Sequence, residues 1–294
     1  SMLLGTTGTK QHGSEDLQML IKQKIGRINF QVNTLPGEDV EHCRVQLVAR
    51  MACLPEQGEE AIELLTEILR DTEFSDRKLL RDRLSQAALN AQMSLADNGE
   101  EYAEIRVGAY NSARGVAQEY LCGREMAVWL KKQAAAEDTE LDTVLHTMQM
   151  LAARIFAESR MTVSCSDNVK NEWLDILTLP QGCPAPKWAV YAPWGARQEG
   201  LTIPASVSFA VKGTNFKRRG GKFSGCYPVL VNILTFTYLW GEIRVQGGAY
   251  GCGLIARNDG DVAFYTYRDP QPGRSLKIMN GAAQYIRDFC TAGN

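Results

Sequence analysis

Residues 241–253 read Gly241-Glu-Ile-Arg244-Val-Gln-Gly247-Gly248-Ala-Tyr250-Gly251-Cys-Gly253 and do most to decide the fold. A largely apolar run at 226–242 precedes them and predicts a helix, while 250–256 and 262–267 have the pattern of strands. Five glycines in thirteen residues let the backbone approach a ligand closely or adopt φ values that other residues avoid. The stretch therefore predicts a helix-to-strand corner with unusual backbone freedom.

An arginine and a tyrosine, Arg244 and Tyr250, flank the glycines of this corner. Such a pair can donate hydrogen bonds to a peptide carbonyl and to the oxyanion that forms when water attacks it. In a purely structural alternative, Arg244 caps the end of the helix and Tyr250 packs against the fold. The residues alone leave both interpretations open.

The order of elements around the corner occurs twice in the chain. In each copy a helix, a glycine-marked turn and two strands lead to a P-x-x-G pattern that opens another helix, so that Pro55 and Gly58 recur 215 residues later as Pro270 and Gly273. This spacing is too long for a solenoid and favours two homologous domains, each a mainly antiparallel sheet covered by helices, which is an α+β fold. The alternative is that two Pro-Gly helix starts coincide by chance.

Five prolines and three glycines lie in residues 180–204, which predicts a linker. We therefore expect one domain over residues 1–179, with an almost wholly helical pattern from 76 to 136 that is interrupted at Asn98-Gly99 and Cys122-Gly123, and a second over 205–294 that carries Arg244 and Tyr250. In the first domain, Ser14 is expected to cap a short helix, and residues 162–166 are expected to form a closing strand.

The composition is that of a soluble globular protein: 294 residues, 22% of them charged, with a net charge of −2. The short basic run Lys217-Arg218-Arg219 is the longest, so nucleic acid is not an expected partner. No window approaches the roughly 20 apolar residues that cross a bilayer, so no membrane association is expected. Eight cysteines without a C-x-x-C pair predict reduced, buried thiols in a reducing compartment.

Two other patterns, a possible zinc motif and a possible cysteine nucleophile, are weaker indications of a catalytic site. His12-Gly-Ser-Glu15-Asp16 lacks the second histidine of an H-x-x-E-H zinc helix, because Asp16 stands in its place. The remaining histidines, His42 and His146, have no ligand-like spacing, so we expect His12 to mark a surface helix start and this chain to bind no metal. Cys165 with His146 could form a nucleophile and base, but nothing local marks either residue, and core packing is favoured.

Two separate stretches resemble a known family. Trp240-Gly-Glu-Ile-Arg-Val-Gln-Gly-Gly-Ala-Tyr-Gly, then Phe264-Tyr-Thr-Tyr-Arg-Asp-Pro270 and a helix ending Tyr285-Ile-Arg-Asp-Phe, is similar to the last domain of presequence proteases, a branch of the insulinase/pitrilysin zinc metallopeptidases. Phe74-Ser-Asp-Arg77, Tyr102-Ala-x-x-Arg106-Val-Gly-Ala-Tyr110-Asn-Ser and Gly115 resemble the penultimate domain. The resemblance covers nearly the whole chain.

This resemblance implies four homologous domains, arranged as two halves around a closed chamber that admits unfolded peptides. It implies that the first domain carries the zinc ligands and that the last domain contacts the substrate. On this basis Arg244 and Tyr250 are the expected catalytic contacts to the substrate carbonyl and transition state, and Gly247 and Gly248 the expected substrate-binding glycines.

The same resemblance implies that the chain begins inside the third domain, ends before the fourth is complete, and has the N-terminal half of the same polypeptide as its partner. Zinc would be bound by that half, so we expect this chain alone to be inactive. We also expect surface that is normally covered to favour self-association.

The expected function is the substrate-binding part of a zinc endopeptidase that degrades short unstructured peptides. A non-catalytic structural or peptide-binding homologue is the main alternative, and a free-standing cysteine hydrolase is a third. By resemblance, the expected compartment is the cytoplasm in a bacterial host or an organelle matrix in a eukaryotic one.

Overall fold

The computed structural model describes residues 1–166, 168–185 and 188–292. The chain forms two compact units whose segments alternate along the sequence. The first unit contains Ser1–Asn33, Gln46–Ala88 and Trp129–Lys187, and the second contains Thr34–Val45, Leu89–Val128 and Trp188–Asn294. The boundaries expected at 179 and 205 concern family domains rather than compact units, and they stay a prediction.

The first unit is mainly helical. In α2 (Gly58–Asp71), Ala61, Leu64 and Ile68 are buried at three- and four-residue spacing, and Leu17 of α1 (Ser14–Lys24) joins the same core. This spacing places apolar side chains on one helix face. The unit also contains η1 (Pro55–Gln57), α7 (Asp138–Ile155), η2 (Glu158–Arg160), α8 (Asn171–Leu174), most of β1 (Arg27–Pro36) and β2 (His42–Ala52), and parts of α3 (Arg77–Asp97) and α6 (Arg124–Ala134).

Two local predictions in this unit are wrong. Gly13 is the N-cap of α1 and makes no side-chain cap bond, while Ser14 is already helical. Residues 162–166 are irregular and exposed rather than a strand. Their alternating pattern fits a strand, but a strand also requires a neighbour with which to pair.

The strands form two small sheets, with the orders β1-β2-β3 and β4-β6-β5. In the first sheet, β2 pairs antiparallel with β3 (Ala189–Val190). In the second, β6 (Asp261–Asp269) lies between β4 (Ser208–Asn215) and β5 (Gly251–Ala256), antiparallel to both. The predicted α+β class is confirmed.

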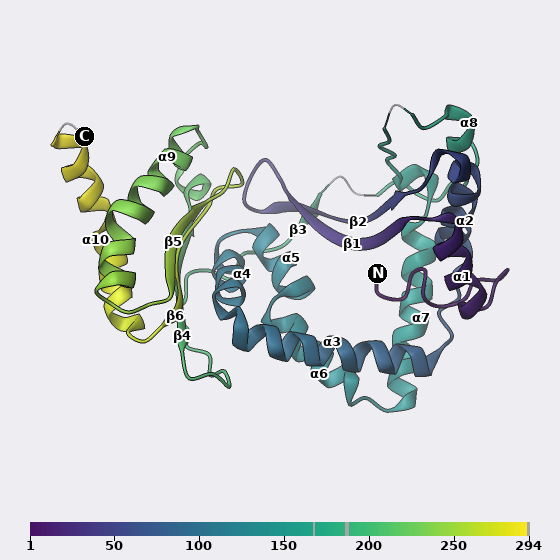
Figure 1. Cartoon of the computed structure of the whole chain (residues 1–294), viewed down its shortest axis with the longest axis horizontal. Helices are drawn as coiled ribbons and strands as arrows, with labels where there is room; N and C mark the ends of the chain where they lie inside the picture. The colour runs from purple at the N-terminus through teal and green to yellow at the C-terminus, as the bar shows by residue number, and fades with distance from the viewer. Residues whose placement is uncertain (167, 186–187, 293–294) are drawn as a thin grey trace. The chain divides into compact units, whose positions relative to one another are not determined.

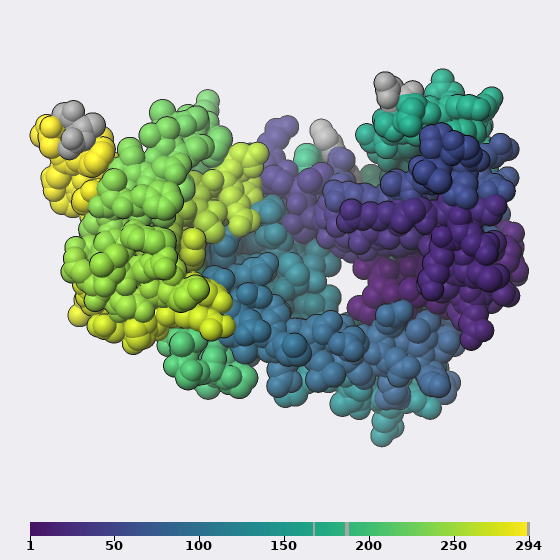
Figure 2. Space-filling model, in the orientation of Figure 1, coloured from purple at the N-terminus to yellow at the C-terminus, as the bar shows by residue number. Residues whose placement is uncertain are grey.

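Helices cover both faces of the β4-β6-β5 sheet in the second unit (Figure 1). One face packs against η4 (Leu234–Val245) and α10 (Pro272–Thr291). Helix α9 (Cys226–Ile233) runs directly into η4. The buried side chains of this layer include Leu239, Ile243 and Leu254. The other face meets α4 (Gly99–Asn111). Figure 2 shows α9 and η4, in green, as a broad exposed part of this unit.

Helices α4 and α5 (Ala113–Cys122) approach closely enough for their backbones to touch. A Cβ added to Gly115 would lie 2.1 Å from the carbonyl carbon of Gly108. The Ser112 hydroxyl caps α5 by accepting a hydrogen bond from the Gly115 amide at 3.1 Å. The predicted helix breaks at 98–99 and 122–123 are confirmed, and Ser112 adds a break that the sequence pattern did not indicate.

Part of the predicted linker is tied to α4. The Trp194 amide donates to the Ala109 carbonyl at 3.0 Å, and the Trp194 ring lies 4.6 Å from the Arg106 guanidinium carbon. Arg106 also donates to Glu199 at 2.8 Å. These contacts hold residues 194–199 against the helix as a strap.

The strap predicts a pH-dependent stability. Hydrogen bonding and charge from Arg106 lower the pKa of Glu199 from 4.5 to about 2. Because the folded pKa is depressed, the ionised carboxylate stabilises the fold above pH 4.5, and this contribution is lost as pH falls towards 2. The side chain is 25% exposed, so solvent screening limits the contribution to about 1 kcal/mol. Urea unfolding between pH 7 and 2 should show this extra loss in the wild type but not in Glu199→Gln, and equal pH profiles would contradict it.

The prediction of buried cysteines is wrong for most of them. Only Cys43 and Cys252 are fully buried, Cys53 is half-buried, and the other five are exposed; all eight are free thiols. Apolar flanks do not fix which face of an element a cysteine occupies, which is why composition misled here. In the part of the chain that the structure describes, no helix has the length and apolar character needed to cross a membrane.

Candidate functional site

The corner that carries Arg244 and Tyr250 is built by a π-helix. The predicted helix at 226–242 is α-helical only to Ile233, and η4 continues it with wider turns, as in the bond from the Gln246 amide to the Gly241 carbonyl at 3.0 Å. Gly248, with φ of +80°, then reverses the chain. The Tyr250 amide bonds to the Tyr267 carbonyl of β6 at 3.1 Å, which fixes the start of β5.

Arg244 and Tyr250 lie together on this corner. The Arg244 guanidinium carbon is 4.1 Å from the Trp240 ring centroid and 5.8 Å from that of Tyr250. Tyr250 is 68% exposed, and its ring meets Tyr267 edge-on at 5.9 Å. Across the described residues, Arg244 makes no ion pair and its guanidinium caps no helix carbonyl. The arrangement leaves the donors of both side chains available to a ligand.

Arg106 and Tyr110 provide a contrast within the same unit. They stand in Arg-Val-Gly-Ala-Tyr, a pattern close to that of the corner, and Arg106 also lies over a tryptophan ring. Arg106 is only 13% exposed, however, and is surrounded by carboxylates from Glu119 (3.2 Å), Glu125 (3.1 Å) and Glu199 (2.8 Å). Its charge is used inside the fold, whereas Arg244 has no such partner within the described ranges.

Burial controls the ionisation of the groups around Arg106. Burial raises the pKa of Glu119, whose side chain is fully enclosed, and raises that of Tyr110 to about 12. Both groups therefore resist losing a proton. Sequence reasoning missed this network because Glu119, Glu125 and Glu199 come from separate segments.

The two glycines of the predicted site differ in their surroundings. Gly248 is exposed and has the positive φ that favours glycine. Gly247 is buried, and a Cβ there would lie 2.4 Å from the Ile243 oxygen and 2.9 Å from Arg274 Nη1. The need for glycine at 247 is thus explained by internal packing, while Gly248 alone faces outward.

The other sequence candidates do not form a site. Cys165 and His146 are both exposed, so the prediction that they pack in the core is wrong. His12 precedes α1 and places Nδ1 2.9 Å from Glu67 Oε1, which makes it part of a polar cluster with buried Glu67 and Thr9. Burial raises the pKa of Cys252 to about 11, so this thiol beside Arg244 is a poor nucleophile at neutral pH.

Metal binding is not supported by the residues in the described ranges. No group of three or more His, Cys, Asp or Glu side chains there could hold an ion. Within these ranges the sequence candidate His12 pairs with Glu67.

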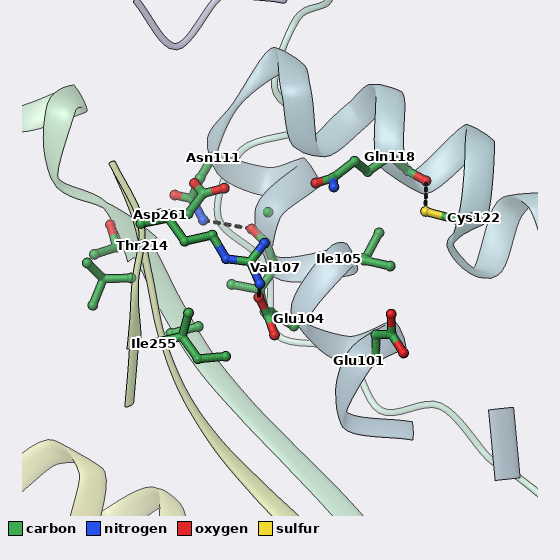
Figure 3. A pocket seen from close by; sticks show the side chains of 14 residues that line it. Glu101, Glu104, Ile105, Val107, Asn111, Gln118, Cys122, Thr214, Ile255 and Asp261 are labelled. Atoms are coloured by element: carbon green, nitrogen blue, oxygen red, sulfur yellow. Dashed lines mark hydrogen bonds and ion pairs between the residues drawn. The ribbon is translucent and has the colours of Figure 1, made fainter. Parts of the chain in front are cut away.

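A separate cavity of about 130 Å³ lies between α4 and the sheet (Figure 3). Its polar groups mainly satisfy one another: Arg257 pairs with Glu104, and the Asn111 amide donates to the Val107 carbonyl at 2.8 Å. Burial, with a contribution from nearby Asp259, raises the pKa of Asp261 to about 6. None of the corner residues lines this cavity, so it is distinct from the Arg244 site.

The fold has counterparts among peptidases. The crystal structure of the periplasmic protease PqqL from Escherichia coli matches with a TM-score of 0.50 and 12% identity, covering 98% of this chain and 30% of that one. At this identity the match concerns the fold alone. It is nevertheless the class of fold that the sequence predicted.

Sequence comparisons specify the family. Residues 1–133 match the family model of the domain associated with M16 peptidases of subfamily C, and residues 198–292 match "PreP C-terminal domain". Protein HypA of Clostridium perfringens is 26% identical over 98% of this chain, and the mitochondrial presequence protease of Eremothecium gossypii is 26% identical over 95%. The chain is therefore similar to presequence proteases over nearly its whole length, and the predicted resemblance is confirmed. It spans about 30% of the length of these two relatives.

Proposed function

We propose that the chain is the C-terminal, substrate-binding portion of a longer zinc-dependent endopeptidase that degrades short unstructured peptides. The family assignment supports a peptidase parent. The finer assignment of the substrate contacts rests on the geometry of the Arg244 corner.

The observation that carries the proposal is the charge of Arg244, which no carboxylate among the described residues pairs, beside exposed Tyr250. Neither Trp240 nor Tyr250 neutralises the guanidinium, because an aromatic face attracts a cation without cancelling its charge. A charged donor held in place can stabilise the negative charge that develops on a peptide carbonyl oxygen during hydrolysis. The Tyr250 hydroxyl supplies a second, neutral donor from the same surface.

In the proposed mechanism, this chain binds and orients the peptide. When bound in the N-terminal half of the longer protein, as expected, zinc would provide the activation of water for attack. Arg244 and Tyr250 would hold the scissile carbonyl and its developing charge, while Gly248 lets the peptide approach the backbone. On this proposal the 294-residue chain alone binds peptide but does not hydrolyse it.

Equilibrium binding tests the proposed contact directly. With a fluorescently labelled unstructured peptide and the 294-residue chain, Arg244→Ala should raise the Kd about 10-fold, the effect of losing a hydrogen bond from a charged donor. Arg287→Ala is the matched control, because Arg287 lies on α10 and bonds to Gln284 one turn away. Equal Kd values for the wild type and Arg244→Ala would contradict the proposal.

A further inference from the structure

The π-helix η4 directs main-chain carbonyls towards the neighbouring helix α10. The carbonyl oxygens of Thr237 and Glu242 in η4, and of Gly247 two residues after its end, are spaced five residues apart, which is the offset between acceptor and donor in a π-type hydrogen bond. Each accepts a hydrogen bond from a side chain of α10 or its N-cap. The bonds come from Tyr285 Oη to Thr237 (3.0 Å), from Arg274 Nη1 to Glu242 and from Gln271 Nε2 to Gly247 (3.2 Å).

This regular set of bonds explains how a long π-helix is stabilised. Long π-helices are rare, and a segment of twelve residues needs compensating contacts to remain wider than an α-helix. Three carbonyl groups bonded at π spacing provide them, because a return to α spacing would turn these oxygens away from their donors. Tyr238 adds a bond in the opposite direction, from its hydroxyl to the Ile278 carbonyl at 2.9 Å.

The buried glycine of the corner belongs to the same arrangement. Because the Gly247 Cβ position is only 2.9 Å from Arg274 Nη1, any side chain there would displace the guanidinium. Arg274 also lies 3.5 Å from the Glu242 carboxylate, so both the main chain and the side chain of Glu242 anchor it. The absence of a side chain at Gly247 therefore leaves the space that the Arg274 guanidinium occupies.

We propose that Gln271, Arg274 and Tyr285 are positioning residues that hold η4 in the π-helical register. That register sets the direction of Arg244, near the end of η4, relative to Tyr250, which β6 fixes independently through its amide. An effect of this register on peptide hydrolysis rests on the proposed function. The dependence of the register itself on Gln271, Arg274 and Tyr285 does not. The two can therefore be tested separately.

The structural test uses 19F NMR of the 294-residue chain labelled with 5-fluorotryptophan. The sequence contains five tryptophans, and Trp240→Phe identifies the resonance of the one within η4. Arg274→Ala should shift the Trp240 resonance and leave the other four in place, and Tyr285→Phe should do the same by removing the hydroxyl that donates to the Thr237 carbonyl. Arg287→Ala should shift none. An unmoved Trp240 resonance in Arg274→Ala and Tyr285→Phe overturns the proposal, and Tyr285→Phe decides alone should Arg274→Ala fail to fold.

The kinetic test uses the longer protein that contains the chain. Arg274→Ala should lower kcat/KM about 10-fold, but should cause no further loss when added to Arg244→Ala, because it acts through Arg244. Full additivity would overturn the positioning role. A shifted Trp240 resonance together with no effect of Arg244→Ala on activity would instead preserve the register role and reject the proposed function.

Discussion

Arg244→Ala in the longer protein is expected to lower kcat/KM for an unstructured peptide about 10²-fold, with about 10-fold of the loss in kcat and the rest in peptide binding. A loss of this size follows the removal of a donor that stabilises an oxyanion. Arg244 is suited to this role because it lies 5.8 Å from the exposed Tyr250 ring and pairs with no carboxylate in the described residues. Initial-rate kinetics with a quenched peptide measures the change.

Conservative variants separate the chemistry from the fold. Arg244→Lys should recover part of the activity, because it keeps the charge but loses the planar set of donors. Tyr250→Phe should lower kcat/KM while retaining the contact with Tyr267, since only the hydroxyl is removed. Arg287→Ala should remain within twofold of the wild type. A normal kcat in Arg244→Ala would show that the guanidinium is not a transition-state contact.

Gly115→Ala is expected to be the most destabilising small substitution in the second unit, at about 1–3 kcal/mol or more. Its methyl group would lie 2.1 Å from a backbone carbon of α4, and a backbone atom cannot move aside as a flexible side chain can. Gly108→Ala is the matched control on the facing helix. Its nearest contact would be an ordinary 3.6 Å, and alanine favours the helix over glycine.

Urea unfolding of the two variants measures this difference. The midpoint of Gly115→Ala should fall well below that of the wild type, while that of Gly108→Ala should stay equal or rise. Similar midpoints for the two alanine variants would mean that the backbone contact between α4 and α5 is looser than the structure shows.

The sequence predicted features that depend on local residues. Asn98-Gly99 and Cys122-Gly123 break the helical pattern, and both breaks occur where expected. The positions of β5 and β6 in the second sheet also followed from their patterns, because strand and helix periods differ strongly. The Arg244–Tyr250 proximity was expected from the glycine-rich corner between them.

Features that depend on long-range contacts could not be predicted. The π-helical register of η4 requires hydrogen-bond donors from α10, about thirty residues away or more. The apolar sequence of η4 does not indicate which distant side chains will bond to its carbonyl groups. The proline-rich composition of 180–204 favoured a linker, but Trp194 finds Arg106 and fastens part of it. Likewise, only the folded chain shows that Arg106 is neutralised while Arg244 is not.

Hydrolysis of a quenched, unstructured peptide in the presence of zinc tests the central claim most directly. The longer protein and the 294-residue chain are compared at equal concentration, each with and without a chelator. The account predicts that the longer protein cleaves the peptide, that chelation abolishes cleavage, and that the chain alone binds without cleaving. A longer protein that binds the peptide but never cleaves it would contradict the account and indicate a non-catalytic peptide-binding homologue.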